Sequence, residues 1–153
     1  MDMIALGGFL AFCFLAAQIG SWFTASHVEG WYASLRKPNW TPPNWLFGYV
    51  WSVLYASMAI AAWLIWRRGG GWGRELWLFT AQLALNVAWS AIFFGLRSPA
   101  AAFVEIVILW AAILITMISF WRIYAVAGQL MVPYLGWVSF AAALNFAIWR
   151  MNP

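Results

Sequence analysis

The sequence predicts an all-α membrane protein in which residues 1–153 form a single domain, a bundle of five transmembrane helices. Hydrophobic residues make up 66% of the 153 residues and charged residues only 8%, whereas a soluble domain is about 45–50% apolar and about 25% charged. Five apolar stretches are long enough to cross about 30 Å of hydrocarbon. Lipid offers backbone groups no hydrogen-bond partners, so only helices and closed barrels can cross a membrane. The apolar residues of these stretches do not alternate with polar ones, which argues against a barrel and leaves helices.

The predicted spans are residues 4–23, 46–66, 76–95, 100–121 and 129–149. The first is not expected to be a cleaved signal peptide, because no basic region precedes it. Charged residues, Gly and Pro predict short loops at 67–71, 96–99 and 122–128. Only the first connection, residues 24–45, is long. Lys and Arg are shared equally between the two sets of loops, so the positive-inside rule predicts no orientation.

Several classes of function are excluded by residue counts. One Cys, one His and four carboxylates are too few for an internal disulfide, or for a metal centre with three or four clustered ligands. The single His has no acidic residue at a spacing typical of a catalytic triad, so such a triad is not predicted. The net charge of +4 is spread over all the loops and does not form the basic face of a nucleic-acid binder.

One face of the third span carries only small residues. At about 100° per residue they fall within roughly a 60° sector. They are Ala84, Ala88, Ala91 and Gly95. Small residues let helices approach closely in a membrane, so this face predicts packing against another span or against a second subunit.

The opposite face of the third span carries amides and aromatic rings, namely Gln82, Asn86, Trp89 and Phe93. An unpaired amide in lipid is costly, so Gln82 and Asn86 are predicted to face the bundle interior. Two roles stay open for them, which are hydrogen bonding between helices and a polar contact to a ligand.

Deep aromatic residues on three spans predict a flat-walled cavity. Trp51 and Tyr55 share a face of the second span, and Trp137 shares a face of the fifth with Ala141. Together with the polar face of the third span they would wall an apolar cavity suited to a planar hydrophobic ligand; simple packing of large rings is the alternative. The residues of this cavity are Trp51, Tyr55, Asn86, Trp89 and Trp137.

The long first connection is predicted to be an ordered lid over the mouth of the bundle. Residues 31–45 contain three prolines interleaved with aromatic rings, and proline opposes regular helix. Arg36 and Lys37 in this segment are expected to meet either an anionic ligand group or lipid phosphates. Glu105, the only carboxylate within a span, is expected to reach the interface or to pair with an arginine.

Three segments resemble those of a known family. Residues 31–45, W-Y-A-S-L-R-K-P-N-W-T-P-P-N-W, resemble the first-loop motif of the translocator protein family, which includes bacterial tryptophan-rich sensory proteins and the mitochondrial peripheral benzodiazepine receptor. Residues 82–95, Q-L-A-L-N-V-A-W-S-A-I-F-F-G, are similar to its third helix. Residues 133–137, P-Y-L-G-W, and 144–150, L-N-F-A-I-W-R, resemble its fifth. The likeness covers nearly the whole chain in order.

The resemblance implies an integral multi-pass protein of a bacterial cell envelope membrane, often a homodimer. It implies binding of porphyrins such as protoporphyrin IX or haem, and of synthetic benzodiazepine or isoquinoline ligands, with no obligatory cofactor. Ligand-binding positions carry over to Trp51, Asn86, Trp137 and Ala141, and lid positions to Trp31, Tyr32, Trp40 and Pro43.

One departure from the family concerns sterols. The mitochondrial members have a proposed cholesterol motif built on Leu, Tyr and Arg, and Leu144, Phe146 and Arg150 occupy the matching positions. The missing phenol argues against tight sterol binding, and motifs of this kind are weak.

Three hypotheses of function follow. The first is a receptor or transporter-like binding protein for porphyrins that regulates tetrapyrrole metabolism or stress signalling. The second is an enzyme that degrades porphyrins photo-oxidatively. No acid, base or metal is placed for ordinary catalysis, so indoles would have to carry the chemistry, and the resemblance implies Trp51 and Trp137 for this activity. The third is a regulatory protein that binds membrane partners through its small-residue face.

Overall fold

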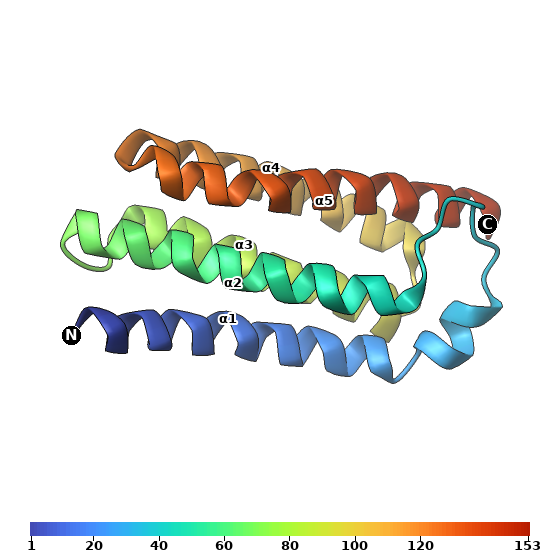
Figure 1. The fold of residues 1–153 in the computed structure, drawn as a ribbon. Helices are drawn as coiled ribbons and strands as arrows, with labels where there is room; N and C mark the ends of the chain where they lie inside the picture. Colours follow the sequence, from blue (N-terminus) through green and yellow to red (C-terminus); the bar gives the residue numbers. More distant parts are fainter.

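The computed structural model describes residues 1–153 as a bundle of five long helices without strands (Figure 1). Each helix is long and apolar enough to cross a membrane, which confirms the predicted fold. The helices are α1 (Asp2–Ala25), α2 (Asn44–Gly69), α3 (Arg74–Ser90), α4 (Pro99–Ile123) and α5 (Ala125–Met151), with two π-helical turns, η1 (Val28–Tyr32) in the first connection and η2 (Ala91–Gly95) continuing α3.

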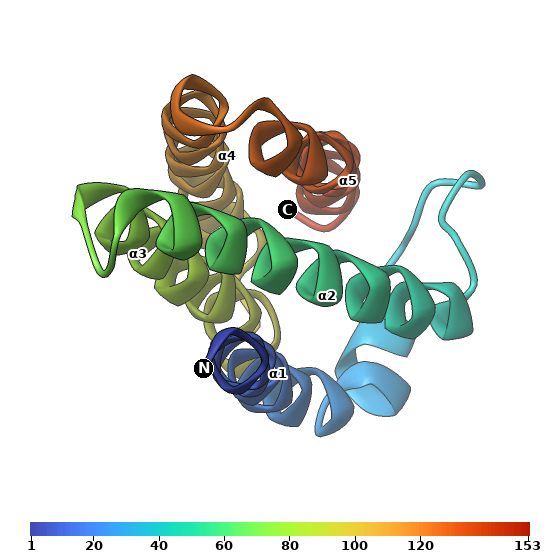
Figure 2. The ribbon, with the colours of Figure 1, turned by 60° about the vertical axis from the view of Figure 1, so that its left-hand side comes forward.

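Successive helices run in opposite directions along the bundle. The N-terminus, the α2–α3 turn and the α4–α5 turn lie at one end, and the long first connection and the C-terminus lie at the other, which we call the loop end (Figure 1). The helix α2 lies between α1 and α5 (Figure 2). The helix α3 packs against α1 and α4, and α4 packs along α5.

Local chemistry explains where the short turns fall. The helix α2 ends at Gly70, which adopts a left-handed conformation with φ of 74° and donates its N–H to the Trp66 carbonyl, as glycine commonly does at helix C-termini. At the start of α4, the Ser98 side chain accepts from the Ala101 N–H, and Pro99 occupies the first turn, where its missing N–H costs nothing.

The connection between α4 and α5 is much shorter than predicted. Only Tyr124 lies outside the two helices, so the loop expected over residues 122–128 is wrong. Gly128 lies within α5, and a Cβ atom placed on it would come within 2.7 Å of the Trp121 Cβ. This glycine permits a close approach of the two helices, and Arg122 continues α4, so neither residue marks a loop.

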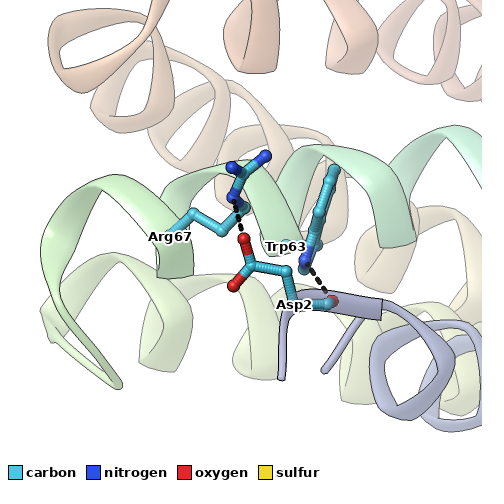
Figure 3. A network of polar contacts seen from close by, with 3 residues as sticks. All are labelled: Asp2, Trp63 and Arg67. Carbon is cyan, nitrogen blue, oxygen red and sulfur yellow. Dashed lines mark hydrogen bonds and ion pairs between the residues drawn. The ribbon is translucent and has the colours of Figure 1, made fainter. Parts of the chain in front are cut away.

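At the end of the bundle opposite the loop end, α1 and α2 are joined by polar contacts between half-exposed side chains. The Arg67 Nε lies 3.1 Å from the Asp2 carboxylate, and the Trp63 indole N–H donates to the Asp2 backbone carbonyl at 3.0 Å (Figure 3). The Arg67 guanidinium also lies 4.8 Å from the centre of the Trp63 ring. An exposed ion pair contributes about 0–1 kcal/mol, so this contact sets the register of the helices more than the stability of the bundle.

The buried interior divides into two parts. The larger part is an apolar core to which all five helices contribute, and in it Phe79 of α3 stacks on Phe120 of α4 at 6.0 Å. The smaller part is an aromatic cluster at the loop end, built around Tyr32, Phe93 and Phe94. The polar pocket residues lie where these two parts meet.

Candidate functional site

A pocket of about 680 Å³ lies among α1, α2, α3 and α5, toward the loop end of the bundle. Its lining is mainly apolar and aromatic. All the ligand-binding residues predicted from the sequence line it, namely Trp51, Tyr55, Asn86, Trp89, Trp137 and Ala141. The fold therefore brings together residues from three helices that are as much as 90 positions apart in the sequence.

A chain of buried hydrogen bonds begins at two residues of the pocket lining, Tyr55 and Asn86. The Tyr55 hydroxyl donates to Asn86 Oδ1 at 2.6 Å, and Asn86 Nδ2 donates to the Tyr134 hydroxyl at 2.7 Å. Tyr134 in turn donates to Gln82 Oε1 at 2.8 Å. These bonds join α2, α3 and α5, and they satisfy polar groups that lipid could not.

The structure distinguishes the roles of Gln82 and Asn86, for which both hydrogen bonding between helices and contact with a ligand were open. Gln82 is fully buried, bonds to Tyr134 and does not line the pocket, so it acts between helices. Asn86 bonds to Tyr55 and Tyr134 and also lines the pocket. Only one of the two hydrogens on its Nδ2 is used by Tyr134, since an amide nitrogen carries two donors.

Tyr134 is a central residue that the sequence reasoning missed. It has no exposed surface and connects both amides of α3. A signal for it was present, because it precedes Trp137 by three residues, and positions three apart share a helix face. The P-Y-L-G-W segment supported the family resemblance, but its spacing also places Tyr134 on the same helix face as Trp137.

A second polar contact holds the aromatic wall of the pocket. The Trp89 indole N–H donates to Asn145 Oδ1 at 3.0 Å, and Asn145 Nδ2 donates to the Pro99 carbonyl at 2.8 Å. The Trp89 ring also stacks on Phe93 at 5.1 Å. By contrast, the Trp137 indole nitrogen is buried and has no hydrogen-bond partner.

The predicted lid residues take different places. Tyr32 is buried, lines the pocket and packs against Phe94 at 5.6 Å; burial raises the pKa of its phenol above the usual value. Trp31 packs on Phe93 at 5.7 Å. Trp40 and Pro43 do not line the pocket: Trp40 is half-exposed on Phe140, and Pro43 precedes α2.

The Lys37 ammonium and the Arg36 backbone hold the loop, and neither residue lines the pocket. Lys37 Nζ donates to the carbonyls of Tyr32 at 2.7 Å and of Leu35 at 3.1 Å. The backbone N–H of Arg36 donates to Asn152 Oδ1 at 3.0 Å, and Asn152 Nδ2 donates to the Arg36 carbonyl at 2.8 Å. Neither cation lines the pocket, so a direct contact with a ligand there has no support.

The expectation for Glu105 is wrong. This residue is 8% exposed and both its carboxyl oxygens lack a hydrogen-bond partner. The one ion pair of the structure joins Asp2 and Arg67. Glu105 falls on the face of α4 that also carries the buried Ala102 and Leu109, and helical periodicity therefore turns it inward, away from any arginine.

The small-residue face of α3 and η2 is covered at one end, at Gly95, and keeps exposed surface along the rest. A Cβ on Gly95 would lie 3.1 Å from the Phe23 ring, so Gly95 serves packing of η2 against α1. Ala84 is exposed, and Ala88 and Ala91 are partly exposed. This stretch keeps a free surface of small residues.

Comparison with known sequences decides the family. The sequence profile of the TspO/MBR family matches residues 9–150, a range that contains every pocket residue discussed above. The chain belongs to the TspO/MBR family. With five helices able to cross a membrane, this TspO/MBR protein is an integral, multi-pass membrane protein.

Relatives in the TspO/MBR family are similar over nearly their whole length. The tryptophan-rich protein TspO of Chlorobaculum tepidum is 43% identical over 157 residues, covering 99% of this chain and 98% of the relative. The translocator protein of Homo sapiens is 40% identical over 144 residues, covering 90% and 84%. The protein CrtK of Rhodobacter capsulatus is 38% identical over 160 residues, covering 100% and 96%.

Proposed function

We propose that this TspO/MBR protein is a membrane receptor that binds planar hydrophobic ligands of the porphyrin class in the pocket and thereby regulates tetrapyrrole metabolism or a stress response. The main support is the pocket itself, a cavity of about 680 Å³ walled by aromatic rings from several helices. Ligand sites typically measure about 300–1,000 Å³ and are apolar with a few placed polar groups. Relatives named translocator protein and tryptophan-rich sensory protein fit a receptor or regulatory role.

The lining suggests how such a ligand would be held. Burial of a flat apolar ring contributes about 25 cal/mol per Å² before the costs of association are subtracted. The indole rings of Trp51 and Trp137 offer faces for offset or edge contact. Orientation would come from two donors, the unpartnered Trp137 indole N–H and the second hydrogen of Asn86 Nδ2.

A titration of purified protein with protoporphyrin IX, followed by quenching of tryptophan fluorescence, tests this proposal. Wild-type protein is expected to show saturable quenching. Ala141→Phe places a ring inside the cavity and is expected to weaken binding most, while Trp51→Phe and Trp137→Phe weaken it by removing wall area. Trp77→Phe is the control, because Trp77 is 64% exposed and does not line the pocket.

Two outcomes decide between the functions considered. If Ala141→Phe and both tryptophan variants bind porphyrin like Trp77→Phe, the pocket is not the site. If illumination of the bound complex yields a new absorbing product with wild-type protein but not with Trp51→Phe or Trp137→Phe, a photo-oxidative enzyme replaces the receptor.

We also propose that the protein forms a homodimer through the free part of the small-residue face. Ala84, Ala88 and Ala91 leave room for a second helix to approach closely. Ala88→Leu is expected to shift a dimer to a monomer in detergent size-exclusion chromatography. An unchanged elution volume would show that this face is not the interface.

A further inference from the structure

A second hollow lies on the outside of the bundle, between α2 and α5. It is a groove of about 460 Å³, bounded on the α2 side by Tyr49, Val50, Val53 and Leu54 and on the α5 side by Pro133, Gly136, Trp137 and Phe140. The two helices lie next to each other along the bundle (Figures 1 and 2). The groove is therefore separate from the interior pocket described above.

The groove lies over Gly136 of α5, the one lining residue that has no side chain. No heavy atom lies within 4 Å of the position that a Cβ on Gly136 would take. Large side chains stand on either side of this gap, with Tyr49 71% exposed on α2 and Phe140 on α5. The result is an open apolar hollow on the lipid-facing side of α2 and α5, lined by aromatic and aliphatic side chains.

The chemistry of the groove selects a hydrocarbon chain. No charged residue lines it, so it offers no ion pair to a lipid headgroup or to a soluble anion. It lies within two helices that cross the membrane, where Val53 is 68% exposed, so the phase in contact with it is the acyl region of the bilayer. A flexible acyl chain is the apolar group that this region of the bilayer supplies to such a hollow.

Trp137 joins the groove to the interior pocket. Among the residues that line the groove, it is the only one that also lines the pocket. Its ring packs against Phe140 at 5.4 Å and Phe47 at 5.7 Å, and its indole nitrogen has no hydrogen-bond partner. Only apolar contacts hold this indole, so pressure from either side can tilt it.

We propose that the α2–α5 groove binds one acyl chain of a membrane lipid and that Trp137 couples this chain to the ligand pocket. A chain in the groove presses the indole toward the pocket and changes its shape. Because coupling is reciprocal, a ligand in the pocket changes the affinity of the groove for the chain by the same factor. The acyl-chain site stands on the groove alone, and the coupling rests on the proposed ligand pocket.

Photolabelling tests the acyl-chain site directly. The full chain is placed in phosphatidylcholine vesicles that contain a lipid with a diazirine on its acyl chain, and adducts are mapped after irradiation. We expect adducts to concentrate on residues 49–54 and 133–140 and to fall several-fold in Gly136→Leu, which fills the groove. Val53→Trp fills it from the α2 side. Gly8→Leu is the control, since Gly8 is exposed and has open space around it on α1.

The coupling is tested by titrating the same vesicles with protoporphyrin IX. Gly136→Leu and Val53→Trp are expected to change the porphyrin affinity by about fivefold or more, within the usual range of coupling between sites, whereas Gly8→Leu leaves it unchanged. Adducts spread evenly over the lipid-facing sides of all helices would overturn the acyl-chain site. Unchanged affinity in both groove variants would overturn the coupling. Failure of wild-type protein to bind porphyrin at all would instead overturn the proposed function and leave the labelling result intact.

Discussion

The close approach of α4 and α5 makes a sharp prediction about Gly128. This residue is buried in the first part of α5. A Cβ built on it would lie 2.7 Å from the Trp121 Cβ and 2.8 Å from the Trp121 Cα. Carbon atoms pack best at about 3.5–4.0 Å, so the start of α5 has to move away from α4 in Gly128→Ala.

The size of the effect follows from two opposing contributions. Overpacking of this kind costs about 1–3 kcal/mol, and the clash is with the Cα, Cβ and ring Cε3 of Trp121 and not with the far end of a flexible side chain. Alanine gains about 0.8–1.0 kcal/mol over glycine in helix propensity. Gly128→Ala is therefore expected to lower the free energy of unfolding by up to about 2 kcal/mol.

Gly136→Ala is the matched control, because it makes the same change in the same helix. No heavy atom lies within 4 Å of its Cβ position, so only the propensity gain of up to about 1 kcal/mol remains. Unfolding in mixed micelles with increasing SDS, followed by tryptophan fluorescence, measures both variants. The difference between them is the overpacking cost alone; a difference below about 0.3 kcal/mol, the usual error of such comparisons, would refute the reasoning.

Two further contacts can be tested in the same way. In a double-mutant cycle, Asn86→Leu and Tyr134→Phe are expected to show a coupling energy of about 0.6–1.7 kcal/mol, the range found for hydrogen bonds between membrane helices; additive effects would mean that the 2.7 Å bond contributes nothing. Asn152→Ala removes both hydrogen bonds to the Arg36 backbone and is expected to speed limited proteolysis of residues 33–43 while leaving the SDS midpoint nearly unchanged. Equal proteolysis rates in wild type and variant would show that Asn152 does not hold the loop.

Six of the 25 residues that line the pocket could be named from the sequence, because polar and large aromatic residues are conspicuous in a membrane helix. Asn86 is polar where lipid penalises polarity, and helical spacing places Trp51 with Tyr55 and Trp137 with Ala141. Those arguments required only the period of one helix. They did not reveal which amide would face a cavity, because that depends on the side chain opposite, and the position of Tyr134 on another helix decides it.

The errors have a common physical cause. Arg122 and Gly128 look like loop residues by type, yet Gly128 serves a contact with Trp121 that exists only when α4 and α5 are side by side. For Lys37 the sequence left an anionic ligand group and lipid phosphates open, and the structure adds bonds to carbonyls of its own loop that neither alternative named. In both cases residue type was a guide to chemistry but not to the partner, since the partner is supplied by tertiary packing.

By itself, the sequence determined that this TspO/MBR protein lies in a membrane, that it crosses five times and that the amide face of the third span turns inward. Hydrophobic length and helical period are sufficient for these, because the bilayer imposes both. The tertiary structure alone decided that Asn86 and Tyr134 join into one buried chain, that Glu105 is left without a partner, and that Trp137 stands between an inner pocket and an outer groove. These depend on the distance and rotation between helices, which no single helix encodes.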